Sequence, residues 1–331
     1  MSVFKILIDS LIHYYMFDDF FFIKAKKPMW PASANVFVIK DEEGLILIEV
    51  GCGLRKHTQF LFKKLNDLNL KLDDVHTIVI SHAHPDHMGA MDVIYEKINH
   101  SDVKIIINKI EKDYALNINL LNESFDTDLL KNLNFESKLN DIFKGEFNLN
   151  HFFKSFCSMS QLLDETEIQT INENDILKLG NYEFKVLTTP GHAPGHTSFY
   201  ETNHNFLLAG DLIGEFGTAW YSPSSGGAIG YLSSLEKVEK LPIEYVYPSH
   251  GNKFYNVQER INQIRKKILS KDEIILENLK KTPFTFLELI NLFYQGKELQ
   301  LLTGVLMIES HLIKLEKENK IERKNDLILK V

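Results

Sequence analysis

The stretch that decides the fold is His82-Ala83-His84-Pro85-Asp86-His87, which directly follows the apolar run Thr77-Ile78-Val79-Ile80. A short apolar run of this kind is typical of a buried β-strand. Four side chains that can bind a metal lie within the six residues from His82 to His87. Because the strand ends before them, we expect them in a loop, where they can converge from different directions. Imidazole and carboxylate groups are the usual ligands of zinc in proteins. The spacing predicts a metal site rather than a His-rich surface turn.

Three later segments have the same form, an apolar strand followed by a metal-capable side chain beside Gly or Pro. They are Thr189-Pro190-Gly191-His192-Ala193-Pro194-Gly195-His196, Gly210-Asp211 and Pro248-Ser249-His250-Gly251. Glycine permits close backbone approach and unusual dihedral angles, so it suits a turn that carries a ligand. The four segments together supply five His and two Asp, enough for two metal ions, with His196 left outside that set.

At these residues the sequence resembles the metallo-β-lactamase superfamily, over about Pro28 to Gly251. The resemblance implies an α/β protein, an αβ/βα sandwich with a dinuclear site at one edge. It implies two zinc ions, with iron or manganese as alternatives, and a bridging hydroxide as the nucleophile. The implied ligands of one metal are His82, His84 and His192, and those of the other are Asp86, His87 and His250, with Asp211 bridging both. Asp86 and Asp211 are the implied catalytic residues.

A closer resemblance is to the beta-lactamase-like protein 2 family. It is carried by Gly210 to Thr218, the predicted helix from Tyr231 to Leu241 and the segment Tyr247 to Gly251. The segment His311 to Ile321 also resembles the winged-helix-like tail of that family. Members include an endoribonuclease that prefers single strands and many bacterial hydrolases of unknown substrate, so the resemblance leaves the substrate open.

One residue departs from the superfamily pattern. The second strand normally ends in an Asp before Thr-Gly, whereas here it ends Ile48-Glu49-Val50-Gly51. We interpret Glu49 as a tolerated exchange, and its alternative role is to orient a ligand from a different distance. His196 is usually not a ligand in this family, and we interpret it as a supporting or structural residue.

The rest of the chain divides into a catalytic domain over residues 1–259 and a tail over residues 260–331. Residues from about 111 to 164 contain many Leu, Asn and Phe and no Pro, which predicts a helical insertion. The insertion is either a packed subdomain or a lid with Phe152, Phe153 and Phe156 on its apolar face. Three predicted helices followed by a strand–turn–strand pattern give the tail a winged-helix outline.

Charge and composition restrict the class of protein. The formal net charge of −8 excludes a uniformly basic nucleic-acid binder. The tail carries 14 Lys and Arg against 10 Asp and Glu, so its net charge is +4 and that of the remainder is −12. Two cysteines cannot form a disulfide framework, and we find neither a signal peptide nor a membrane span. We therefore expect a cytoplasmic protein without a membrane partner.

These observations predict a zinc-dependent hydrolase acting on a small ester, lactone or thioester. The first alternative is an endoribonuclease that cleaves single-stranded RNA, and the second is a non-enzymatic metal-containing scaffold or sensor. A homodimer is a further expectation. The loop residues Tyr221, Ser224 and Ser225 are candidates for contacts with substrate oxygen atoms, against a simple connecting loop, whereas Arg55 is interpreted as a surface residue.

Overall fold

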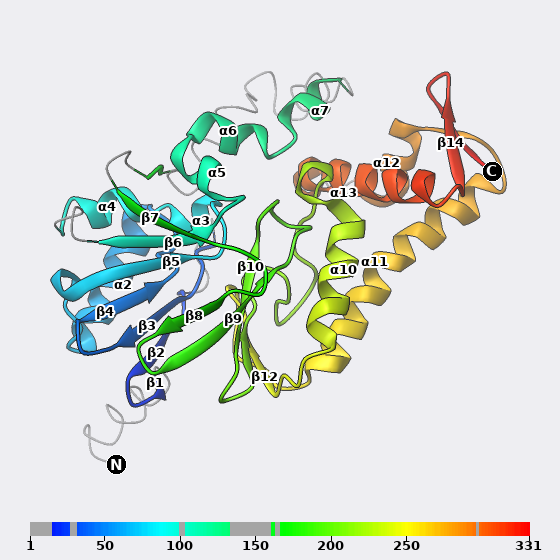
Figure 1. The fold of residues 1–331 in the computed structure, drawn as a ribbon. Coiled ribbons are helices and arrows are strands. Elements are labelled where there is room, and N and C mark those ends of the chain that lie inside the picture. Colours follow the sequence, from blue (N-terminus) through cyan, green and yellow to red (C-terminus); the bar gives the residue numbers. More distant parts are fainter. Residues whose placement is uncertain (1–14, 27–31, 99–102, 133–159, 163–165, 296–297) are drawn as a thin grey trace, which may run out of the picture.

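The computed structural model describes residues 15–26, 32–98, 103–132, 160–162, 166–295 and 298–331 (Figure 1). Two β-sheets form the centre of the fold. The first sheet has the strand order β1-β2-β3-β4-β5-β6-β7. Its strands are β1 (Tyr15–Phe17), β2 (Phe20–Ile23), β3 (Val36–Lys40), β4 (Leu45–Ile48), β5 (Val75–Ile80), β6 (Lys104–Asn108) and β7 (Glu167–Ile171). β1 to β4 pair in antiparallel fashion, and β4 to β7 are parallel.

The second sheet has the order β12-β11-β10-β9-β8. Its strands are β8 (Ile176–Leu179), β9 (Tyr182–Thr188), β10 (Thr197–Glu201), β11 (Phe206–Leu208) and β12 (Tyr245–Tyr247). β8 to β11 are antiparallel, whereas β11 and β12 are parallel. Parallel pairing needs a crossover, and the helix α10 (Gly227–Glu239) provides it.

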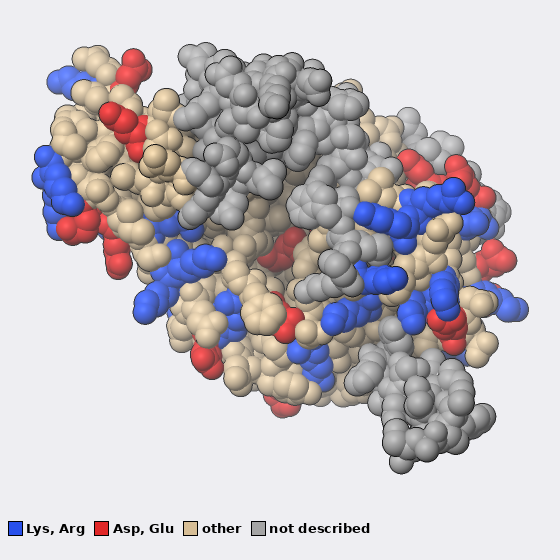
Figure 2. All heavy atoms as spheres, turned by 180° about the vertical axis from the view of Figure 1, so that it is seen from behind, with Lys and Arg blue, Asp and Glu red and all other residues tan. Residues whose placement is uncertain are grey.

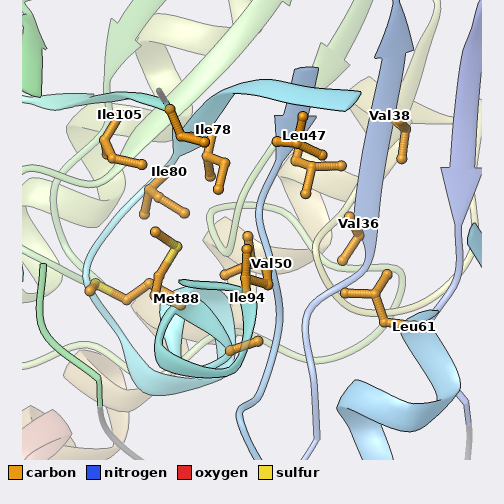
Figure 3. Packing of buried hydrophobic residues seen from close by; sticks show 14 of the residues in the cluster. Val36, Val38, Leu47, Val50, Leu61, Ile78, Ile80, Met88, Ile94 and Ile105 are labelled. Atoms are coloured by element: carbon orange, nitrogen blue, oxygen red, sulfur yellow. The ribbon is translucent and has the colours of Figure 1, made fainter. Parts of the chain in front are cut away.

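Alternation along the strands produces the layers of the sandwich. In β3, Val36 and Val38 face one way and Phe37 and Ile39 the other, as the period of two requires. The first pair contributes to a core under the outer helices of the first sheet, which are α2 (Arg55–Asp67), α3 (Pro85–Met88) and α4 (Met91–Tyr95). Figure 3 shows this core, with Leu61 on α2 and Ile94 on α4 pointing toward the sheet.

A second core lies between the two sheets and is rich in aromatic rings. Phe20 from the first sheet meets Phe184 and Phe206 from the second, and Phe37 meets Tyr247. The aromatic run Phe20-Phe21-Phe22 lies in the buried strand β2. On the far side of the second sheet, α10 and α11 (Val257–Leu279) cover a third core (Figure 1). The result is the predicted arrangement of two sheets between helical layers.

The predicted insertion begins with three short helices, α5 (Lys112–Leu116), α6 (Ile118–Glu123) and α7 (Thr127–Asn132). They follow β6 and lie at one edge of the sandwich (Figure 1). Phe152, Phe153 and Phe156, which were assigned to the face of a lid, lie outside the described residues. Residues 1–14, which precede β1, also lie outside them.

The C-terminal part contains α11, α12 (Phe286–Tyr294) and α13 (Glu298–Lys317), in agreement with the three helices predicted for the tail. A three-stranded sheet joins them, in the order β13-β15-β14, with β13 (Phe284–Thr285), β14 (Ile321–Lys324) and β15 (Leu327–Lys330). These elements share their own apolar core, which includes Leu289 and Leu312. Among the described helices, none combines the length and apolar character that spanning a lipid bilayer requires.

The structure corrects some predicted boundaries. Helix α10 begins at Gly227 rather than Tyr231, because Gly226, with φ +96°, turns the chain directly into it. Its Gly-rich first turn has a low helix propensity, so the pattern did not indicate a helix there. The edge strands β7 and β8 were not predicted. Much of their surface is exposed, which leaves only a weak hydrophobic signal.

Candidate metal centre

The four motifs meet where four strands end. His82 and His84 follow β5, and Pro85 then begins α3, so Asp86 and His87 lie in its single turn. Proline suits the first position of a helix because its fixed φ matches that of the helix, and the N–H that it lacks would have no partner within the helix. The other motifs follow β9, β11 and β12 of the second sheet. The site therefore lies at one edge of the sandwich, where loops from both sheets converge.

The first group of candidate ligands consists of His82, His84 and His192. One nitrogen from each ring lies within 4.8 Å of the others, and all three residues are buried. The Nδ1 atom of His84 is 2.9 Å from the Nε2 atom of His192. Three imidazoles at this separation can hold one metal ion.

The second group consists of Asp86, His87 and His250, together with Asp211, again with one donor atom from each within 4.8 Å. The Nε2 atom of His250 is 3.1 Å from Oδ2 of Asp86. His87 Nε2 lies 3.4 Å from Oδ1 of Asp211. This group mixes nitrogen and carboxylate donors.

Asp211 lies between the two groups. Its Oδ2 atom is 3.2 Å from His192 Nε2 in the first group. Its Oδ1 atom is 3.5 Å from His250 Nε2 in the second. The two oxygens of one carboxylate therefore face the two groups, which is the position that a bridging ligand needs.

Neighbouring residues hold the ligand side chains in place. The Nδ1 atom of His82 lies 2.9 Å from Ser81 Oγ. The Nδ1 atom of His192 lies 2.7 Å from the carbonyl oxygen of Trp220. The backbone N–H of Asp211 donates to His196 Nε2 at 2.8 Å. This contact supports the interpretation of His196 as a supporting residue. Such outer contacts orient metal ligands and fix the imidazole tautomers.

Glu49 also lies beside the site. Its Oε2 atom is 3.4 Å from His87 Nδ1, and its Oε1 atom accepts the backbone N–H of Ser81 at 3.3 Å. Glu49 is buried and adopts a left-handed backbone conformation, with φ +65°. Glu49 therefore contacts a candidate ligand directly. This contact agrees with the alternative interpretation, in which Glu49 orients a ligand.

Buried donor atoms without a hydrogen bond indicate that the residues fit a metal. His82 Nε2, His87 Nε2 and Asp211 Oδ1 are buried and make no hydrogen bond with any residue that the structure describes. Leaving such atoms unpaired is costly, and native proteins rarely do so without a reason. A bound cation would satisfy all three. Imidazole nitrogens and carboxylate oxygens are the donors that zinc accepts.

The electrostatics of the site also suit a cation. Burial and the neighbouring imidazoles hold the pKa of His82 well below its usual value, so its ring is neutral. Burial opposes charge on Asp211, but His250 and His87 hold the pKa of its carboxyl well below the usual range. Burial likewise disfavours a charged His87, yet Asp211 and Glu49 raise its pKa well above the usual value. A proton on His87 would have to leave before a metal binds there.

Sequence reasoning missed Glu111, which ties two of the motif loops together. Its Oε2 accepts the backbone N–H of Ala83 at 2.9 Å, and its Oε1 accepts that of Gly195 at 2.6 Å. The residue is buried, and burial raises the pKa of its carboxyl to about 7. The only signal in the sequence is an acidic residue shortly after a predicted strand.

The predicted substrate contacts are corrected in part. Tyr221 is fully buried and its hydroxyl bonds to His311, so the prediction that it contacts substrate is wrong. Ser225 is buried too, with its hydroxyl 3.2 Å from that of Ser222. The Ser224 hydroxyl bonds to Asp126 in the insertion at 3.0 Å. Arg55 is exposed at the start of α2, as expected.

The fold consists of two facing sheets between helical layers, and seven His and Asp side chains gather at one edge of it. These features define a protein of the αβ/βα sandwich class with a candidate metal site. The model of the metallo-beta-lactamase superfamily matches residues 29–250, and the chain belongs to that superfamily.

Relatives and solved structures agree with this assignment. The chain is 24% identical over 318 residues to "Probable metallo-hydrolase YqjP" of Bacillus subtilis, covering 92% of this chain and 94% of that protein. A metallo-beta-lactamase family protein from Thermus thermophilus matches with a TM-score of 0.75 at 18% identity, over 96% of this chain and all of the other. A beta-lactamase domain protein from Burkholderia ambifaria matches with a TM-score of 0.74, also at 18% identity, over 96% of this chain and 93% of the other. At these identities the structures show a shared fold alone.

Proposed function

We propose that this chain is a dinuclear zinc-dependent hydrolase that acts on a small ester, lactone or thioester. The observation that carries the proposal is the convergence of two candidate ligand groups on the single carboxylate of Asp211. The first group would hold one ion and the second group the other. When bound, the two ions would supply Lewis-acid chemistry that activates water and polarises the bond to be broken.

The chain's own residues would contribute position and proton transfer. Asp86 is partly exposed, and its Oδ2 lies 3.1 Å from His250 Nε2. Burial opposes its charge, but His87 and His250 lower the pKa of its carboxyl to about 2, so it would act as a carboxylate that takes a proton from water and passes it to the leaving group. Asp211 would hold the two ligand groups at a fixed separation. The hydrogen bond from its backbone N–H to His196 fixes the start of the loop that follows β11. The side chains of His82, His84, His87 and His192 are buried, which shields their donor atoms from bulk water. Asp86, Asp211 and His250 are partly exposed.

The wall beside the first group favours a substrate with an apolar part. The Phe125 ring stacks on His84 with centroids 5.1 Å apart, and the Trp220 ring lies 6.1 Å from that of His192. Aromatic surfaces of this kind bind acyl or alkyl groups more readily than phosphates. This supports an ester, lactone or thioester.

An endoribonuclease is the second candidate, and the charge distribution disfavours it. RNA binding draws most of its affinity from cationic side chains along the phosphate backbone. The remainder of the chain outside the tail carries a net charge of −12, and the tail only +4. On the face in Figure 2, Lys and Arg side chains are interspersed with Asp and Glu instead of forming one unbroken track.

We also propose that the C-terminal part is a winged helix like that of the beta-lactamase-like protein 2 family. Support comes from three helices, a hairpin and a sheet in which β15 lies between β13 and β14. A winged helix often binds DNA. The burial of α13 against α10, through Gly227 and Ser310, favours a packing role here.

A substrate panel tests the proposed function. We expect wild-type protein loaded with zinc to hydrolyse generic lactones, thioesters or carboxylic esters but not single-stranded RNA. Asp211→Ala should lose more than about 100-fold in turnover, because outer partners of a metal site alone are worth about 10–100-fold. Asp73→Ala serves as the matched control, since Asp73 is exposed on the 3₁₀ turn η1 (Leu72–Asp74) of the first sheet's outer layer.

The outcomes separate the candidates. RNA cleavage without ester turnover would establish the nuclease instead. Two bound zinc ions without turnover of any ester, phosphodiester or RNA would favour the non-enzymatic scaffold. Full activity of Asp211→Ala would contradict the metal mechanism itself.

A further inference from the structure

The loop that supports His192 is itself held by the C-terminal part of the chain. The Nδ1 atom of His192 lies 2.7 Å from the carbonyl oxygen of Trp220. The next residue, Tyr221, is fully buried, and its hydroxyl lies 2.7 Å from Nε2 of His311 on α13. Two adjacent residues therefore connect a candidate metal ligand to α13, whose His311 is 90 positions after Tyr221.

The connection continues into α11. The Nδ1 atom of His311 lies 2.6 Å from Oδ1 of Asp272, and Lys314 donates to Oδ2 of the same carboxylate at 2.8 Å. His311, Asp272 and Lys314 are all buried. A buried acid–base pair of this kind rarely adds stability over an apolar core, so a role in fixing geometry is the better explanation.

The direction of each hydrogen bond follows from the charges. Burial opposes charge on Asp272, but hydrogen bonds from His311 and Lys314 lower the pKa of its carboxyl, so it accepts. His311 Nδ1 therefore carries the proton and donates to Asp272. Burial lowers the pKa of His311, which keeps its ring neutral and leaves Nε2 as an acceptor for the Tyr221 hydroxyl. Each donor in this series of hydrogen bonds thus has an acceptor.

Apolar contacts reinforce the same connection. The Trp220 ring packs against both the core under the first sheet and the core of the C-terminal part. The backbone N–H of Ala219 donates to the hydroxyl of Tyr231 at 3.3 Å, which anchors the segment from the other side. The carbonyl of Trp220 is thus held by contacts on both sides of it.

We infer that His311 and Asp272 are positioning residues of the metal centre: through Tyr221 they fix the Trp220 carbonyl that orients His192. The C-terminal part of the chain would then set the affinity of the first group for its metal. This inference rests on the metal centre of the proposed function.

The test compares two tyrosine variants of the full chain. Tyr221→Phe removes only the hydroxyl that bonds to His311. Tyr200→Phe is the matched control, because Tyr200 is also buried in the core beneath α10 and its hydroxyl donates to Asn205 at 2.6 Å. Zinc affinity is measured by competition with a chromophoric chelator, and ligand geometry by the visible spectrum of the Co²⁺-loaded protein. We expect Tyr221→Phe to bind one of the two ions about tenfold more weakly, with an altered Co²⁺ spectrum, and Tyr200→Phe to match the wild type.

A double variant covers the case in which Tyr221→Phe does not fold. Tyr221→Phe/His311→Leu replaces both partners of this hydrogen bond by apolar groups, which is far less costly than leaving one unpaired. Asp272 loses the bond from His311 but keeps the one from Lys314. The double variant should fold and still show the weaker site. Wild-type protein that binds two zinc ions, with Tyr221→Phe or the double variant binding them equally well, would overturn this inference alone. Wild-type protein that binds no zinc would overturn the metal centre and the inference with it.

Discussion

At the scale of single residues, Glu111 shows how the site depends on a group that is not a ligand. One carboxylate receives the backbone N–H groups of Ala83 and Gly195, each next to motif histidines. The loops from the two sheets are thereby held at a fixed separation. Burial nevertheless raises the pKa of this carboxyl from 4.5 to about 7, so its charge is costly in the folded state.

This shift predicts how stability changes with pH. The folded-state pKa lies above the unfolded value, so the contribution of Glu111 is fully present below about pH 4.5 and is lost as pH rises through about 7. The loss amounts to at most about 3 kcal/mol. Glu111→Gln cannot ionise, so with a chelator present its free energy of unfolding should rise relative to the wild type over this range. Urea titrations at several pH values measure the difference. If the free energy of unfolding of the wild type instead increases relative to that of Glu111→Gln as the pH rises, the two hydrogen bonds to the carboxylate outweigh the cost of its burial.

At the scale of elements, the contact between the His192 loop and α10 requires a glycine. Gly191 has φ +133°, and a Cβ atom there would lie 2.7 Å from the Cα atom of Tyr231 on the helix. The loop therefore packs directly on the helix backbone, which brings His192 to the first group. Sequence alone indicates a turn at Pro190-Gly191 but not which helix it must touch.

Substitution at this position should affect both stability and the site. We expect Gly191→Ala to cost at least about 2 kcal/mol, from backbone strain and the clash with α10, and to weaken zinc binding. Gly217→Ala is the matched control, because Gly217 has φ +71° but open space around it, so only about 1 kcal/mol of strain is expected. Denaturant unfolding and chelator competition give the two readouts. Equal losses for both variants would argue against the close contact.

At the scale of the whole molecule, the C-terminal core and the catalytic core are joined. Ile261, Ile264 and Ile268 of α11 pack under the second sheet, whereas Ile275 and Leu279 of the same helix belong to the C-terminal core. One continuous helix thus enters both cores. We therefore expect the two parts to unfold together rather than as separate domains.

A cavity in the C-terminal core tests this cooperativity. Leu289→Ala on α12 removes a fully buried side chain and should cost about 2–5 kcal/mol. Leu292→Ala on the same helix is the control, because that side chain is 44% exposed. Helix loss, followed by circular dichroism, and zinc release, followed with a dye, should shift to lower temperature together. Zinc retained beyond the temperature at which the helices melt would show that the parts unfold independently.

The sequence by itself determined the seven candidate ligands and the layered fold. The first four ligands lie within six residues of one another, and the others each follow an apolar strand beside Gly or Pro, so local spacing was sufficient. Only the tertiary structure decided the support of the site: Glu111 between two loops, the Trp220 carbonyl on His192, and His311 behind Tyr221. These contacts join backbone atoms and side chains that are 28 to 90 residues apart. Their partners depend on how whole elements pack, and no spacing along the chain encodes that.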